Sequence, residues 1–114
     1  MVTLMPFDPQ IHIAPLEQWL NREHVRESWG DPAANLASIV ALTPPAGCAL
    51  IAADSALVGF VQWQPMGARE LLESGIVVPD DETIDIDIFI GDADYLGRGI
   101  GPAALALLMK QIAA

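Results

Sequence analysis

Two carboxylates and a glycine-rich segment lie close together in the last third of the sequence. Asp85 and Asp87 alternate with isoleucines, and the segment from Leu96 to Gly101 contains three glycines and one arginine. A carboxylate can hold an ammonium group and accept its proton, directly or through water. Glycines let backbone N–H groups approach an anion, and a helix start adds unpaired N–H donors and a positive dipole. The glycine segment therefore favours a pyrophosphate site, and the two carboxylates share one face of the strand before it.

The glycine segment does not fit the two common nucleotide-binding motifs. A Walker A loop ends in Gly-Lys followed by Ser or Thr, and the segment has no such ending. A dinucleotide fingerprint needs a different spacing of its third glycine and an acidic residue about 20 positions further on. Plain turn chemistry is therefore the alternative to pyrophosphate binding for this segment taken alone.

Acidic residues are concentrated around the two carboxylates. Such a field attracts a polycationic ligand. Metal binding is the rival interpretation, but the spacing lacks the pattern and terminal glutamate of a calcium loop, so we expect no metal. The alternative without function is that Asp85 and Asp87 are simply the solvated face of a half-exposed strand. Seven of the 15 acidic residues lie between positions 80 and 94: Asp80, Asp81, Glu82, Asp85, Asp87, Asp92 and Asp94.

Two tryptophans have different expected roles. Trp29 is a candidate wall for an amine-binding site because aromatic faces pack on sugars and attract cations. A core or helix-end position is the alternative for Trp29. Trp19 shares helical spacing with Leu16 and Leu20, so we expect it in the core.

The histidines and the single cysteine predict little chemistry. His12 and His24 have no cysteine partners at metal-ligand spacing, and both are expected at the surface. Cys48 lies in an apolar run and is expected to be a buried structural thiol. A single cysteine forms no intrachain disulfide, no signal peptide is visible, and no apolar run approaches the ~18 residues of a membrane span. The expected compartment is the cytoplasm.

Hydrophobic periodicity predicts the elements that position these residues. Asp54-Ser55 is the expected turn of a hairpin, Pro65 and Gly67 end its second strand, and the isoleucine face of the last strand must pack on a core. The order predicts an α+β domain whose sheet is mostly antiparallel. Strands are expected over residues 2–5, 48–53, 57–63 and 83–90, and helices over 13–21 with a charged continuation to 27, over 31–42, over 68–74 and from about 100 onward.

Length and composition bound the functional class. The chain has 114 residues, 53% of them hydrophobic, which fits one domain with a real core. Its mean hydropathy is +0.39. The net charge of −10 argues against nucleic acid and against anionic membrane surfaces, because phosphates are bound by Lys and Arg.

The glycine segment, followed by Ala103-Ala104-Leu105, resembles the acetyl-CoA loop of the GNAT N-acetyltransferases. That superfamily has Gln/Arg-x-x-Gly-x-Gly/Ala, whereas Leu96 occupies the first position here. A narrower resemblance, to the aminoglycoside 6′-N-acetyltransferases, covers most of the chain, and siderophore-type acyltransferases share parts of it. Residues 67–82 match those enzymes poorly. The matching blocks are Trp19-Leu20-Asn21-Arg22-Glu23-His24 with Trp29-Gly30, then residues 56–62, then 84–91 leading into 95–101.

The resemblance implies transfer of an acetyl group from acetyl-CoA, as co-substrate, to a primary amine of a cationic small molecule such as an aminoglycoside. It implies Asp87 as the catalytic carboxylate, with Trp29 and Asp85 binding the substrate. A strand in this position offers backbone N–H groups to the pantetheine arm and the thioester carbonyl. The residues implied for the coenzyme are Ile88, Phe89, Ile90, Leu96, Gly97, Arg98, Gly99, Ile100 and Gly101.

The family's chain continues past the loop helix with further strands, a helix and a tyrosine near the coenzyme sulfur. Residues 1–114 are therefore expected to be a single, incomplete GNAT domain, the N-terminal portion of that fold. One alternative is a truncated, non-catalytic acyl-CoA-binding or dimerisation module. In it the isoleucine strand becomes a sheet edge and pairs with a second copy as a homodimer. The other alternative is a siderophore-type N-acyltransferase.

Overall fold

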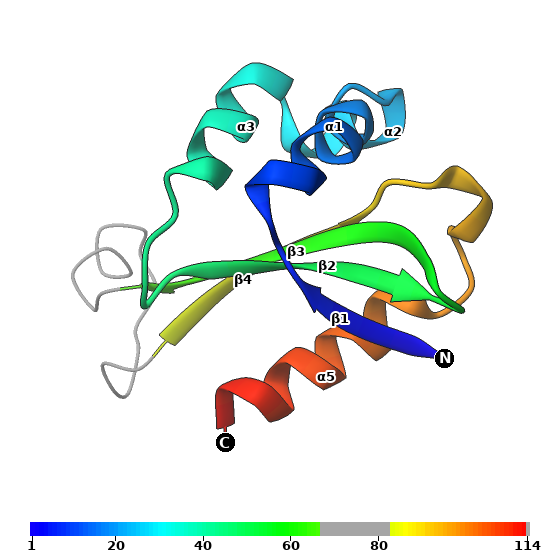
Figure 1. Cartoon of the computed structure of the whole chain (residues 1–114). Coiled ribbons are helices and arrows are strands. Elements are labelled where there is room, and N and C mark those ends of the chain that lie inside the picture. The colour runs from blue at the N-terminus through cyan, green and yellow to red at the C-terminus, as the bar shows by residue number, and fades with distance from the viewer. Residues whose placement is uncertain (67–82, 114) are drawn as a thin grey trace.

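A four-stranded sheet with helices on both faces makes up the computed structural model (Figure 1), which describes residues 1–66 and 83–113. The predicted α+β class with an antiparallel sheet is confirmed. The predicted helix at 68–74 lies outside the described residues. In chain order the elements are β1 (Val2–Pro6), α1 (Pro9–Leu20), α2 (Glu23–Trp29), α3 (Pro32–Val40), β2 (Gly47–Ala53), β3 (Ala56–Met66), β4 (Thr83–Ile90), the short 3-10 helix η1 (Ala93–Tyr95) and α5 (Ile100–Ala113).

The strands are ordered β1-β2-β3-β4. The expected hairpin joins β2 to β3, and its turn residues Asp54 and Ser55 both have positive φ, 51° and 74°. Positive φ at both central residues is the geometry of the tightest hairpin turns. On its other side β3 pairs antiparallel with β4, and Gln62 lies opposite Asp87 in this second ladder.

The predicted end of β3 at Trp63 was wrong. The strand continues through Pro65 to Met66, which lies opposite Thr83 of β4. Proline lacks the N–H that a ladder needs, so it is tolerated where that side of a strand has no partner. β2 begins at Gly47, opposite Trp63, so no described strand flanks the β2 side of β3 beyond this point.

The predicted single helix from residue 13 to 27 is two helices. Between α1 and α2 the Asn21 side chain donates a 2.8 Å hydrogen bond to the Glu17 carbonyl. A side chain that occupies a carbonyl of the last turn competes with continuation of the helix. The start of α3 is as predicted, because the Asp31 carboxylate accepts a 2.9 Å hydrogen bond from the Ala34 N–H and Pro32 follows it.

Two hydrophobic cores lie on opposite faces of the sheet. α1, α2 and α3 cover one face, and α5 covers the other (Figure 1). Phe89 of β4 lies in the first core, so the face that carries the carboxylates also packs on helices. The isoleucine face packs on a core, as expected, and this core also contains residues of α5, although Ile84 at the strand start is 41% exposed. The first core contains Leu16, Trp19, Leu20, Val25, Ile39, Leu50, Phe60 and Phe89; the second contains Ala49, Ile51, Ala53, Val58, Val61, Ile100, Ala104 and Leu108.

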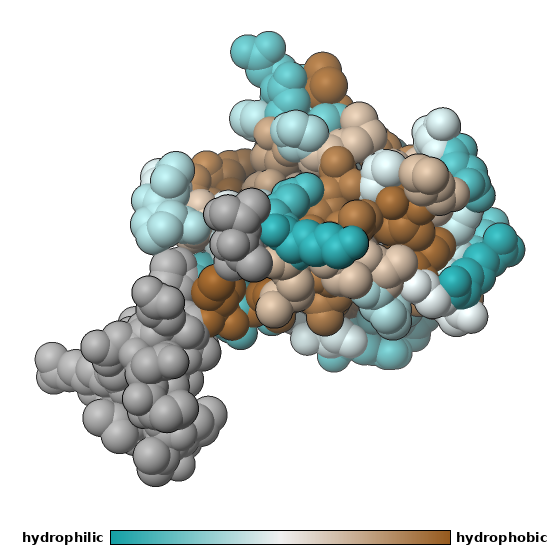
Figure 2. All heavy atoms as spheres, turned by 90° about the horizontal axis from the view of Figure 1, so that it is seen from below, coloured by the Kyte–Doolittle hydropathy of each residue, from teal (hydrophilic) through white to brown (hydrophobic). Residues whose placement is uncertain are grey.

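The outer side of α5 is apolar in part, although Lys110 and Gln111 are also exposed. Apolar side chains occupy much of the centre of the face seen from below (Figure 2), and Leu105 and Met109 are exposed. Among residues 1–66 and 83–113, no helix combines the length and the apolarity that crossing a membrane requires.

The expected surface position of His12 was wrong. Its side chain is 7% exposed, and Nδ1 accepts a 2.8 Å hydrogen bond from the Asp8 N–H. The ring also packs beside Phe7, with centroids 6.0 Å apart. This hydrogen bond satisfies a backbone donor at the start of α1, so His12 is a structural residue.

Candidate functional site

Asp87 and Trp29, which are far apart in the sequence, line one pocket of about 200 Å³. The pocket lies between the end of α2 and the β3–β4 pair, on the sheet face that the first three helices cover. Its other lining residues are Ser28, Asn35 and Gln62. The pocket therefore combines one carboxylate with an indole ring and several neutral polar groups.

Trp29 is both a core residue and a wall of the pocket. Its ring meets Phe89 edge-on with centroids 5.0 Å apart, and it meets Phe60 in the same way at 6.2 Å. Its carbonyl accepts a 2.8 Å hydrogen bond from the Asn35 side chain of α3. Edge-to-face contacts of this kind hold a ring in one orientation. The two interpretations of Trp29 are thus compatible.

Asp87 is exposed, whereas Asp85 is partly buried. The Gln62 amide of β3 reaches Asp87 Oδ2 at 3.5 Å. Asp85 is two residues away on the same face, opposite Gln64, and lies outside the lining of this pocket. An exposed carboxylate next to an indole can hold an ammonium group by charge and by cation–π attraction.

Gln62, Asn35 and Ser28 are pocket residues that the sequence reasoning missed. Strand alternation carries a signal for Gln62, because it shares a face with Phe60 two residues earlier. Asn35 and Ser28 have no such signal. Within the described ranges, no group of three or more His, Cys, Asp or Glu side chains could hold a metal ion.

The backbone at the end of β4 has two differently directed sets of peptide groups. The Gly91 and Asp92 N–H groups both donate to the Val58 carbonyl of β3, at 2.8 and 3.2 Å. Bonded and non-bonded pairs alternate along an antiparallel ladder. The peptide groups of Phe89 therefore point toward β3, and those of Ile88 and Ile90 point to the outer edge of β4. These two N–H groups face away from the neighbouring described strand.

The glycine segment from Leu96 to Gly101, called the glycine loop from here on, connects this strand end to α5. Gly97 and Gly99 have φ values of 74° and 73°, which favour glycine. No neighbouring atom would meet a Cβ within 4 Å at Gly97, Gly99 or Gly101, and Gly97 and Gly99 are exposed, so the backbone at these two glycines is uncovered. The guanidinium of Arg98 lies 5.2 Å from the centre of the Tyr95 ring. An uncovered, glycine-rich backbone beside an arginine suits a phosphate ligand.

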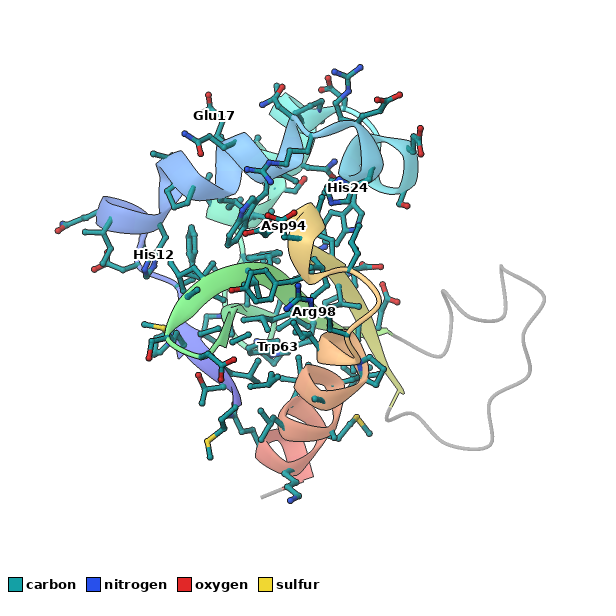
Figure 3. All side chains as sticks on the ribbon, turned by 90° about the vertical axis from the view of Figure 1, so that its right-hand side faces the viewer. His12, Glu17, His24, Trp63, Asp94 and Arg98 are labelled. Carbon is teal, nitrogen blue, oxygen red and sulfur yellow. The ribbon has the colours of Figure 1, made fainter. Side chains whose placement is uncertain are left out.

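The flanking residues of the loop have opposite roles. Ile100, the first residue of α5, is buried in the second core and anchors the helix start, whereas Leu96 is 48% exposed. The Gly99 carbonyl accepts a 3.2 Å hydrogen bond from the Ala103 N–H, which begins the helical bonding. In Figure 3, Asp94 and Arg98 lie between α2, which carries His24, and the start of α5. The loop is thus anchored by packing at its Ile100 end.

Cys48 is partly buried, and burial raises the pKa of its thiol to about 11 from 9.0. The thiolate is the reactive form, and a raised pKa leaves less of it at every pH below 11. At pH 8 we expect Cys48 to be alkylated by iodoacetamide about a hundredfold more slowly in the folded chain than in the chain unfolded in urea. Equal rates would contradict this burial.

Comparison with known proteins gives one family and several similar structures. The acetyltransferase (GNAT) domain family matches residues 8–114. An uncharacterized protein from Bacillus halodurans has a TM-score of 0.74 at 17% identity, over 96% of this chain and 58% of that one. The aminoglycoside acetyltransferase AAC(6')-Ib in complex with coenzyme A has a TM-score of 0.67 at 25% identity, over 97% of this chain and 68% of that one.

A second structure of that enzyme, with coenzyme A and kanamycin, has a TM-score of 0.67 at 24% identity and the same coverage of 97% and 68%. The chain thus spans 58% of the length of the Bacillus halodurans protein and about two thirds of the aminoglycoside acetyltransferase. No curated protein matches the sequence.

Proposed function

The chain belongs to the GNAT acetyltransferase domain family, and from this premise we propose that it takes part in acetyl transfer from acetyl-CoA to a primary amine of a cationic small molecule. The observation that carries the proposal is the pocket shared by Asp87 and Trp29. Asp87 of that pocket is followed in β4 by Ile88, whose N–H faces the outer edge of the strand. An amine site and a coenzyme track would then be adjacent.

The proposed coenzyme site uses two parts of the backbone. The outward N–H groups of Ile88 and Ile90 would bind the pantetheine arm and the thioester carbonyl, as donors fixed before the ligand arrives. The loop from Leu96 to Gly101 would bind the pyrophosphate at the start of α5. The uncovered backbone at Gly97 and Gly99 supports this fit. Acetyl-CoA supplies the activated acyl group.

The proposed chemistry needs a neutral amine. Asp87 would hold the ammonium form of the substrate and accept its proton, directly or through a water molecule. The free amine would then form the new C–N bond while the C–S bond of the thioester breaks, and coenzyme A would leave as its thiolate, which takes up the second proton of the amine nitrogen directly or through water. Asp85, two residues away, would add negative charge that attracts the substrate without touching the reacting atoms.

An aminoglycoside is the substrate class that we propose. The acidic segment between residues 80 and 94 favours a polycationic ligand, and its described members include Asp85, Asp87, Asp92 and Asp94. One of the similar structures is named as an aminoglycoside acetyltransferase in complex with coenzyme A and kanamycin. The net charge of −10 supports the attraction of a cation.

Two measurements test this function directly. Calorimetry should detect acetyl-CoA binding to the chain, and mass spectrometry should detect a mass increase of one acetyl group on one or more members of an aminoglycoside panel. Parallel incubation with hydroxylated diamine precursors of siderophores separates the siderophore-type alternative. A chain that binds no acetyl-CoA would contradict the proposal.

A glycine variant tests the pyrophosphate loop. Gly99→Ala places a Cβ at a φ of 73°, in the conformation where an L side chain costs about 1–2 kcal/mol. We expect about tenfold weaker acetyl-CoA binding, because the added methyl and the shifted backbone disturb the N–H donors.

Gly30→Ala is the matched control for this loop variant. Gly30 has a φ of 83°, and no atom lies within 4 Å of a Cβ there. Gly30 follows α2, away from the loop, so alanine there also places a side chain at positive φ, but at a position outside the proposed pyrophosphate site. Equal losses of acetyl-CoA affinity in both variants would show that strain alone causes them.

The second candidate function is a binding or dimerisation module without turnover. It is favoured by one observation, that β4 is the last strand of the sheet among the described residues. Strand edges pair readily with another chain. Size-exclusion chromatography with light scattering distinguishes the two, since a monomer with turnover excludes this module.

A further inference from the structure

Two side chains from the start of α2 bind the carbonyl groups at the end of β4. His24 Nε2 lies 2.8 Å from the Ile90 carbonyl oxygen, and Arg22 Nη1 donates to the Gly91 carbonyl at 3.1 Å. Both contacts are partly buried, and each joins residues that are more than 60 positions apart in the sequence. Because a carbonyl oxygen only accepts, the Nε2 atom of His24 carries the proton.

These contacts occur where β4 leaves the sheet. The double donation to the Val58 carbonyl marks an irregular pair at Gly91 and Asp92. The Ile90 carbonyl points to the outer edge, where the described residues provide no strand to bind it. The His24 side chain, from α2, binds this carbonyl in place of a neighbouring strand. The Trp19 ring packs directly against Gly91.

We propose that His24 and Arg22 are positioning residues for the coenzyme. By holding the Ile90 and Gly91 carbonyls, they fix the Ile90–Gly91 peptide, which adjoins the outward Ile90 N–H, and the path of the chain into the glycine loop. The N–H groups of Ile88 and Ile90 and those of the glycine loop would then be held in the relative positions needed to bind the pantetheine arm and the pyrophosphate of one coenzyme molecule. This inference rests on the proposed function, because it assigns the two residues a role in acetyl-CoA binding.

The experiment compares two substitutions of one residue. His24→Ala removes the donor, and His24→Gln places an amide N–H at a similar reach. We expect about tenfold weaker acetyl-CoA binding by calorimetry in His24→Ala, as for loss of one partly buried hydrogen bond. His24→Gln should recover binding to within about threefold of the unsubstituted chain. The KM for the amine should change in neither variant.

His12→Ala is the matched control for loss of a histidine. His12 also binds one backbone group, but it lies at the opposite end of the helical layer from His24 (Figure 3). It should lower thermal stability and leave acetyl-CoA affinity unchanged. Arg22→Met provides an independent variant if His24→Ala does not fold, and it should weaken acetyl-CoA binding in the same direction.

Amide NMR spectra of the same proteins give a readout that needs no ligand. The Ile90 and Gly91 amide signals should shift in His24→Ala and return toward their original positions in His24→Gln. Equal acetyl-CoA affinity in the chain and in both His24→Ala and Arg22→Met, with unshifted amides, would overturn the positioning role alone. An unsubstituted chain that binds no acetyl-CoA would overturn the proposed function, and this role with it.

Discussion

Replacing Asp87 with asparagine is expected to lower kcat/KM for the amine substrate at least a hundredfold. Asparagine has nearly the same shape, and its amide oxygen can still accept from Gln62, which reaches Asp87 at 3.5 Å. It can neither balance an ammonium charge nor accept a proton. Acetyl-CoA binding should be unchanged, because the Asp87 side chain points into the pocket and not toward the strand edge.

Glu17→Gln is the control for Asp87→Asn, because it makes the same change of charge outside the site. Glu17→Gln removes one negative charge on the exposed side of α1, outside the pocket that Asp87 lines. It should leave turnover near that of the unsubstituted chain. Initial rates with saturating acetyl-CoA check both variants, and undiminished turnover in Asp87→Asn would rule out a catalytic role for this carboxylate.

Gly91→Ala is expected to be strongly destabilising, because its Cβ would have the closest contact found at any glycine among residues 1–66 and 83–113. A Cβ at Gly91 would overlap three atoms of the Trp19 ring, Cγ, Cδ1 and Cδ2. Trp19 is 5% exposed and packs in the first core with Leu16 and Phe89, so the ring has no room to withdraw. Overpacking of this kind costs about 3 kcal/mol, which corresponds to a melting temperature lower by roughly 12 °C.

Gly101→Ala is the matched control for stability. No atom lies within 4 Å of a Cβ at Gly101, and its φ is not positive. Since it lies in the first turn of α5, alanine should leave the free energy of unfolding unchanged or raise it by up to about 1 kcal/mol. Urea unfolding of both variants checks the pair, and equal stabilities would show that the Trp19–Gly91 contact is not tight.

The strand that carries the site was predictable to the residue. Its alternation of isoleucine with Asp85, Asp87 and Phe89 has the period of a strand, and the structure has β4 over Thr83–Ile90 as predicted. The start of α3 was equally predictable, because Asp31 and Pro32 are local signals that need no partner elsewhere. The GNAT family was recognised in the same way, from short blocks in the right order.

Errors arose where one specific neighbour, four positions away or on another strand, overrides the usual preference of a residue type. Pro65 ends an ordinary strand, yet here it lies beyond the reach of β2 and is tolerated. His12 has the polarity of a surface residue, but the Asp8 N–H gives it a buried partner. The periodicity of α1 continues toward α2, and the Asn21 side chain interrupts it at the Glu17 carbonyl.

By itself, the sequence determined the elements, the face of β4 that carries the carboxylates, and the glycine loop, because each depends on neighbours within a few positions. Only the tertiary structure decided that Trp29 and Asp87 share a pocket with Gln62. It also decided that His24 and Arg22 bind the end of β4. The physical reason is that strand register and helix packing set which distant residues meet, and no local periodicity encodes that pairing.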